Sequence, residues 1–93
     1  MMESVQLLIS GHVQGVFYRG SVAKKARELN LLGFVRNCPD GTSVEIAAQG
    51  ERSQLDELIA WCHKGPPGAI VQKVKVTWEL TASEPYDSFK ILH

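Results

Sequence analysis

The stretch VQLLISGHVQGVFYRGSVAKKARELN, residues 5–30, changes its apolar spacing partway along. Apolar side chains first alternate with other residues, which is typical of a half-buried strand over Val5–Ser10. From about Gly20 to Leu29 they recur at helical spacing instead, which predicts a helix. The segment between them, Gly11–Arg19, has the character of a turn-rich loop. The stretch therefore predicts a strand, a loop and a helix in succession.

A hairpin and three further elements follow this unit. Phe34–Cys38 and Val44–Gln49 have the character of short strands. Pro39-Asp40-Gly41 between them favours a turn, because Pro fixes φ and Gly tolerates positive φ. The apolar residues then return to helical spacing before alternating again. We expect a helix over about Glu51–Lys64, a strand over Ile70–Glu79 and a last short strand over Tyr86–Leu92.

This order of elements restricts the topology. Strand–helix–strand crossovers are right-handed in nearly all proteins, so both helices must pack on one face of a mainly antiparallel sheet. The sequence predicts an α+β, ferredoxin-like sandwich: strand, helix, strand, strand, helix, strand, with a short extra C-terminal strand. Because this fold hosts many unrelated activities, it does not by itself assign a function.

Length and composition limit the classes of protein to which the chain can belong. With 93 residues, 44% of them apolar, it fits a single domain over residues 1–93. Ten basic residues balance ten acidic ones, which argues against nucleic acid as a partner. No apolar run has membrane-spanning length and no signal-peptide layout surrounds Glu3, so we expect a cytoplasmic protein without a membrane partner. We take it to be a monomer with Cys38 and Cys62 reduced.

The loop GHVQGVFYR, residues 11–19, has features of a phosphate-binding turn. Gly11 and Gly15 let the backbone turn tightly and bring consecutive N–H groups to one concave side. The following helix adds unpaired N–H groups and the positive end of its dipole. Arg19 contributes a planar cation that can bind two phosphate oxygens at once. The alternative is an ordinary loop, with Val13, Val16 and Phe17 or Tyr18 packed beneath it.

A second segment, GFVRNCPDG at residues 33–41, contributes an amide side chain. Asn37 ends a strand that we expect to lie beside the first strand of the sheet. An amide in that place could hold a water near the loop, accepting a hydrogen bond from the water and donating one to an anion. The alternative is that Asn37 is only a turn residue, a position in which Asn is common.

Together the two segments resemble the acylphosphatase family. That family has a GxVQGVxFR-type stretch followed by a GxVxN-type stretch, and GHVQGVFYR and GFVRN match them here, with Tyr18 where Phe is usual. GPPGA at residues 65–69 is similar to the family's link into its fourth strand. Phe89-Lys90-Ile91 is similar to its closing strand, so the resemblance spans nearly the whole chain.

The resemblance implies a hydrolase that splits small acyl phosphates, which are carboxylic–phosphoric mixed anhydrides, into carboxylate and inorganic phosphate by direct attack of a water. Arg19 corresponds to the catalytic arginine that grips the phosphoryl group, and Asn37 to the catalytic residue that positions the water. No metal, cofactor or covalent enzyme intermediate is implied. Phosphate or sulfate would bind in a cradle made mainly by the backbone amides of Gln14, Gly15, Val16, Phe17, Tyr18 and Arg19.

One departure from the family pattern follows the hairpin turn. The family usually has Val two residues after the hairpin glycine, whereas here Thr42-Ser43 follow Gly41 and Val44 comes one residue late. Such an insertion can form a longer turn or a β-bulge, and it leaves the hairpin register open. We interpret Asp40 as a turn residue and His12 as a solvent-facing residue of the loop, neither of them catalytic.

Two other functions compete with hydrolysis. RNA-binding modules with this order of elements stack bases on aromatic residues of their central strands, but neither Val5–Ser10 nor Val44–Gln49 contains an aromatic residue. A non-catalytic phosphate- or ligand-binding module of the same fold would keep the cradle and lack hydrolysis. The presence of both Arg19 and Asn37 argues against that second alternative.

Overall fold

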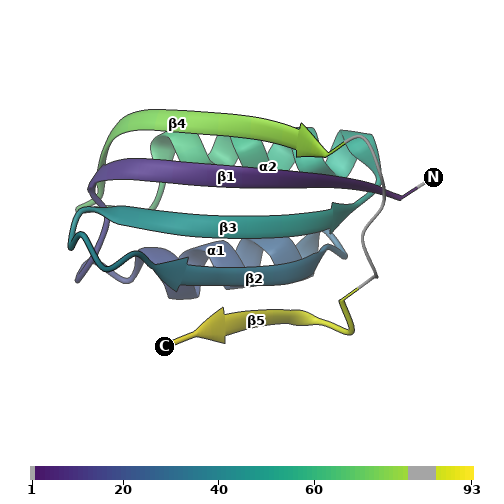
Figure 1. The fold of residues 1–93 in the computed structure, drawn as a ribbon, viewed down its shortest axis with the longest axis horizontal. Coiled ribbons are helices and arrows are strands. Elements are labelled where there is room, and N and C mark those ends of the chain that lie inside the picture. The colour runs from purple at the N-terminus through teal and green to yellow at the C-terminus, as the bar shows by residue number, and fades with distance from the viewer. Residues whose placement is uncertain (1, 80–85) are drawn as a thin grey trace.

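Five strands form one sheet and two helices cover one of its faces in the computed structural model, which describes residues 2–79 and 86–93 (Figure 1). β1 pairs antiparallel with β3 and β4, β2 pairs antiparallel with β3, and β5 lies parallel to β2. The ferredoxin-like sandwich with an extra C-terminal strand is therefore confirmed. The elements are β1 (Glu3–His12), α1 (Tyr18–Glu28), β2 (Leu32–Asn37), β3 (Ser43–Gly50), α2 (Arg52–Lys64), β4 (Ile70–Glu79) and β5 (Phe89–Leu92).

The strand order, β4-β1-β3-β2-β5, corrects one expectation. The strand that carries Asn37 does not lie beside the first strand, because β3 lies between β1 and β2. The crossover from β1 through α1 to β2 leaves room for one strand between β1 and β2, and β3 occupies that position. Asn37 nevertheless reaches the same end of the sheet as the last residues of β1, since Val44 of β3 pairs with both Ile9 and Asn37.

The first strand is longer than expected. β1 continues to His12 and stays paired with β4 after a register shift between Ser10 and Gly11. Gly11 permits this continuation, because its φ is 135° and a Cβ there would collide with the carbonyl oxygen of Ile70 on β4. Part of the predicted loop is thus strand, and its glycine serves the close approach of two strands.

Two further boundaries differ from those expected. α1 begins at Tyr18 rather than at Gly20, which shortens the connecting loop to residues 13–17. β5 begins at Phe89 rather than at Tyr86, because its pairing with β2 begins only there. Because of the shorter loop, the last two residues of the GHVQGVFYR motif, Tyr18 and Arg19, lie in the first turn of α1.

The core lies between the sheet and the two helices. Val5, Leu7 and Ile9 of β1 are at most 1% exposed, as their alternation predicts. Within the described ranges, no helix is long and apolar enough to cross a membrane. The helices bury their apolar faces: Val22, Ala23 and Ala26 from α1, and Leu55, Leu58 and Cys62 from α2.

The extra residue after the hairpin turn is taken up by a longer turn. Pairing between β2 and β3 runs without a register shift from Leu32 and Gln49 to Asn37 and Val44. The Asp40 carboxylate accepts hydrogen bonds from both amides of Thr42-Ser43 and from the Ser43 hydroxyl. The Ser43 hydroxyl bond in particular holds the pKa of Asp40 below its usual value. Asp40 is therefore a turn residue, as predicted.

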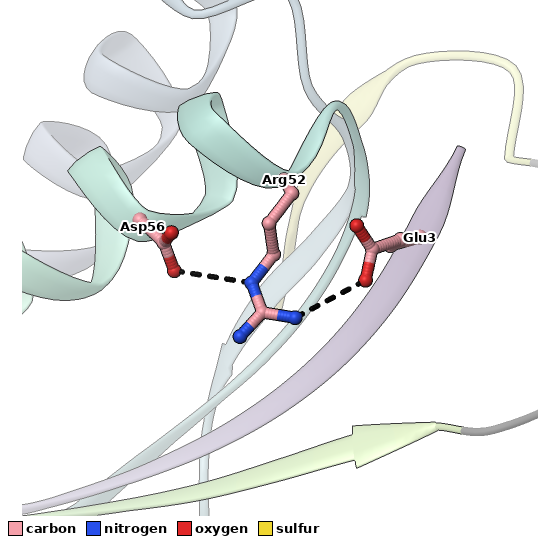
Figure 2. Close-up of polar contacts among 3 residues, drawn as sticks. All are labelled: Glu3, Arg52 and Asp56. Carbon is pink, nitrogen blue, oxygen red and sulfur yellow. Dashed lines mark hydrogen bonds and ion pairs between the residues drawn. The ribbon is translucent and has the colours of Figure 1, made fainter. Parts of the chain in front are cut away.

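The opposite end of the sheet is held by a charged cluster around Arg52, the first residue of α2. Its Nη1 lies 3.3 Å from Oε1 of Glu3 on β1, and its Nε lies 3.4 Å from Oδ1 of Asp56 (Figure 2). The guanidinium also stacks over Trp78 of β4, 3.7 Å from the ring centroid. These contacts link α2 to two neighbouring strands and satisfy the arginine's charge.

Candidate active site

Three parts of the chain meet at one end of the sheet, around a cavity of about 300 Å³. The β1–α1 loop with the first turn of α1, the end of β2, and the C-terminal segment each supply part of its wall. The structure thus brings Arg19 and Asn37 into one site, as the sequence analysis required. The lining residues are Val13, Gly15, Phe17, Tyr18, Arg19, Gly20, Asn37, Ile91 and His93.

The β1–α1 loop alternates in backbone handedness. Gly15 has a φ of 77° and Phe17 a φ of 61°, whereas Val16 and Tyr18 have negative φ. Such alternation turns successive N–H groups toward one concave side, an arrangement that suits an anion. The left-handed conformation was expected at Gly15. It was not expected at Phe17, because bulky residues rarely adopt it.

The amides of this loop have no acceptor among the described residues. Within residues 2–79 and 86–93, the N–H groups of residues 14–19 donate to no backbone carbonyl, and no side chain caps α1. Phe17 instead takes the N-cap position, and its carbonyl accepts a hydrogen bond from the Ser21 amide at 3.1 Å. Helix N-termini leave their first N–H groups unpaired, so these amides and the helix dipole together favour an anion.

Tyr18 packs beneath the loop and is 1% exposed. Its hydroxyl donates to the carbonyl oxygen of Cys62 at 2.8 Å, and its ring centroid lies 6.0 Å from that of Trp61. Burial raises the pKa of the Tyr18 hydroxyl well above its usual value and raises the pKa of Cys62 to about 12. Both groups stay protonated at neutral pH, so Tyr18 supports the loop and is not an acid–base group.

Arg19 directs its guanidinium toward the C-terminal segment. Its Nη1 donates to the carbonyl oxygen of Leu92 at 2.9 Å and lies 3.3 Å from Nδ1 of His93. None of the carboxylates in the described parts of the chain forms an ion pair with it. The arginine is therefore oriented by its neighbours without being neutralised, and its charge remains available to an anion.

Asn37 lies at the last position of β2, where its side chain lines the cavity. Its Oδ1 is buried and accepts no hydrogen bond from any described residue. Buried polar atoms are normally paired, and leaving one without a donor costs free energy. An acceptor of this kind beside an anion cradle suits a bound water better than it suits a turn.

Gln14 has a role that the sequence analysis missed. Its side-chain amide donates to the carbonyl oxygen of Cys38 at 3.0 Å and to that of Ser43 at 2.8 Å. Cys38 follows Asn37 directly and Ser43 begins β3, so the two bonds fix the cradle loop to both sides of the β2–β3 turn, next to Asn37. The only signal in the sequence is an amide side chain in an otherwise apolar turn, and the sequence analysis assigns Gln14 to the cradle mainly through its backbone amide.

Other candidate residues lie away from this chemistry. His12 is exposed at the end of β1 and does not line the cavity, as expected. In the part of the chain that the structure describes, no cluster of His, Cys, Asp or Glu could hold a metal ion. A larger hollow of about 690 Å³ lies along α1, α2 and residues 65–69, but neither Arg19 nor Asn37 lines it.

Fold and cavity define a small α+β protein whose β1–α1 loop suits an anion. The acylphosphatase family model matches residues 5–91. An acylphosphatase of Marinobacter nauticus is 53% identical to the chain over 87 residues, which are 94% of this chain and 92% of the relative. The chain therefore belongs to the acylphosphatase family, and it is a hydrolase of acyl phosphates.

Solved structures of the family have the same fold. An acylphosphatase from Coxiella burnetii shares 38% identity and a TM-score of 0.89, with 98% of this chain and 93% of that chain covered. An acylphosphatase from Bacillus subtilis shares 30% identity and a TM-score of 0.91, with both chains covered completely. The similarity extends over the whole architecture, including β5.

Proposed function

We propose that Arg19 and the amides of residues 14–19 hold the phosphoryl group of a small acyl phosphate while Asn37 positions the attacking water. One observation carries the assignment: Gly15, Arg19 and Asn37 line the same cavity, and the buried Oδ1 of Asn37 has no partner among the described residues. A water that donates to this oxygen would satisfy it. The same water would lie beside the phosphoryl group.

The reaction requires positioning and charge stabilisation more than acid–base catalysis. Water attacks phosphorus in line with the bond to the acyl oxygen, that bond breaks, and the acyl group leaves as a carboxylate. Because a carboxylate is a good leaving group, no strong general acid is required. The water's proton passes to a phosphate oxygen, and the Arg19 guanidinium and the loop amides stabilise the negative charge. The enzyme forms no covalent intermediate in this scheme.

Phosphate release from an aryl acyl phosphate tests this function. We expect hydrolysis without added metal and without loss in the presence of a chelator, because Arg19 and the amides supply the positive charge. Inorganic phosphate, the product, should compete with the substrate for the cradle. Activity that a chelator abolishes and magnesium restores would contradict the mechanism, as would purely noncompetitive inhibition by phosphate.

We also propose that residues 1–93 act as a single-domain monomer in the cytoplasm, without a resident cofactor. One continuous match of the family model over residues 5–91 supports the single domain. The balanced charge gives no reason for a permanent partner. Light scattering coupled to gel filtration would measure the mass directly, and a stable dimer would contradict the monomer.

A further inference from the structure

Phe17 stands out among the apolar residues of the described chain because the residue is 76% exposed while lining the cavity. Its backbone is also strained, with a φ of 61° in the left-handed region. Glycine or asparagine adopts this conformation at lower cost. An exposed ring on a strained backbone, beside a reaction site, points to a role in that site rather than in the core.

The helix fixes where the ring lies. A Cβ added at Gly20 would collide with the far end of the Phe17 ring, so the ring rests against the backbone of α1 at that residue. Both residues line the cavity together with Ile91. Gly20 lies in α1 without a positive φ, so its backbone conformation does not require glycine. The missing side chain instead leaves room for the Phe17 ring.

The geometry of the reaction places the acyl group on this side. In-line attack puts the water and the leaving acyl oxygen on opposite sides of phosphorus. The Oδ1 of Asn37 is buried within the site, whereas Phe17 is open to solvent at its rim. A water held by Asn37 therefore directs the acyl group outward, past the face of the Phe17 ring.

We infer that Phe17 binds the acyl group of the substrate and selects aromatic or bulky apolar acyl phosphates over acetyl phosphate. The inference rests on the proposed cradle and water assignments. An aromatic acyl group packed against the Phe17 ring gains both apolar burial and aromatic contact, whereas an acetyl group covers little of the ring face. The contact exists in the bound substrate and in the transition state alike, so it acts mainly on KM.

The test compares kcat/KM for benzoyl phosphate and acetyl phosphate in the parent, Phe17→Asn and Gly20→Ala. Asn accepts the left-handed backbone, and Ala displaces the ring while leaving Phe17 in the chain. Both variants should lower the benzoyl-to-acetyl ratio about 5- to 20-fold, chiefly through KM for benzoyl phosphate. The unfolding midpoints of both variants should stay equal to the parent's or rise. Phe17→Asn relieves backbone strain, and Gly20→Ala replaces a glycine within a helix.

A matched control is Leu8→Ser, which removes another exposed apolar side chain, 39% exposed in the middle of β1 and away from the cavity lining. Its substrate ratio should equal that of the parent. If the parent shows no preference for benzoyl phosphate, or if both Phe17→Asn and Gly20→Ala keep its ratio, Phe17 does not bind the acyl group. Failure of the cradle assignment would differ, because Arg19→Gln would then hydrolyse both substrates normally.

Discussion

Two arginines at opposite ends of the sheet show how the same side chain can hold a fold or serve a site. Arg52 pairs with Glu3 and Asp56 and stacks on Trp78, so its charge is compensated within the protein. Arg19 contacts a carbonyl oxygen and an imidazole nitrogen, and the described part of the chain offers it no carboxylate. An oriented but uncompensated cation in a cavity indicates a binding site, whereas a neutralised one indicates structure.

The largest expected effect comes from Arg19→Gln. This change removes both the charge and the two-pronged donor, so kcat should fall by at least about 1,000-fold and phosphate affinity should fall with it. Arg19→Lys should fail nearly as badly, because an ammonium lacks the planar fork. Steady-state kinetics and phosphate titration on the purified, folded variants measure both effects.

The matched control for this prediction is Arg52→Gln at the other end of the molecule. It removes the same charge and leaves the cavity untouched, so kcat should stay within about twofold of the parent's. Comparable losses in the two variants would show that the overall charge of the protein matters and that Arg19 has no particular role.

The next effect in size is that of Asn37→Ala. The water contact matters chiefly once bond formation begins, so kcat should fall about 100- to 1,000-fold while phosphate affinity stays nearly intact. Near-normal turnover would reduce Asn37 to a turn residue. Loss of phosphate binding as severe as in Arg19→Gln would show that Asn37 binds the anion and does not position the water.

Gln14→Leu should have an intermediate effect. It removes two hydrogen bonds that join the cradle to the end of β2 and the start of β3, and both acceptor carbonyls keep a backbone donor. We therefore expect a loss of about 1–2 kcal/mol of unfolding free energy and a fall of about 10-fold in kcat, from a less precise placement of Asn37. Urea denaturation and kinetics measure the two; unchanged kcat with reduced stability would make the contact purely structural.

The smallest effect is that of Arg52→Gln on stability. Its ion pairs are exposed, with more than half of the arginine side chain open to solvent, and such pairs contribute little. With the Trp78 contact included, the loss of unfolding free energy should be about 1 kcal/mol. Part of this difference should disappear at high salt. If salt does not change the loss of unfolding free energy, the loss comes from packing of Arg52 against Trp78 and not from its ion pairs.

The fold was predictable because several local signals agreed. Alternating residues marked the strands, helical spacing marked α1 and α2, and the turn at Pro39-Asp40-Gly41 set the hairpin. The position of β3 between β1 and β2 was missed, because strand neighbours depend on contacts between distant segments that local patterns do not encode.

The cradle was predictable in part, because Gly15 and Arg19 belong to one short motif. The choice between Phe17 and Tyr18 as the buried ring could also have been made from helical phase. Tyr18 stands four residues before Val22, which the spacing had placed on the inner face of the helix, and both are buried. The contact of Arg19 with Leu92 could not have been found, since it requires knowing that β5 returns beside β2.

That return of the chain has a consequence for how the enzyme is made. The acceptor that orients Arg19 is synthesised 73 residues after it, and Arg27 of the same helix reaches across to the Phe89 carbonyl in the same way. Contacts of such long sequence separation close late in folding, because a long loop must first be ordered. A nascent chain therefore carries the complete GHVQGVFYR motif early, yet gains a correctly oriented Arg19 only after Leu92 has been synthesised.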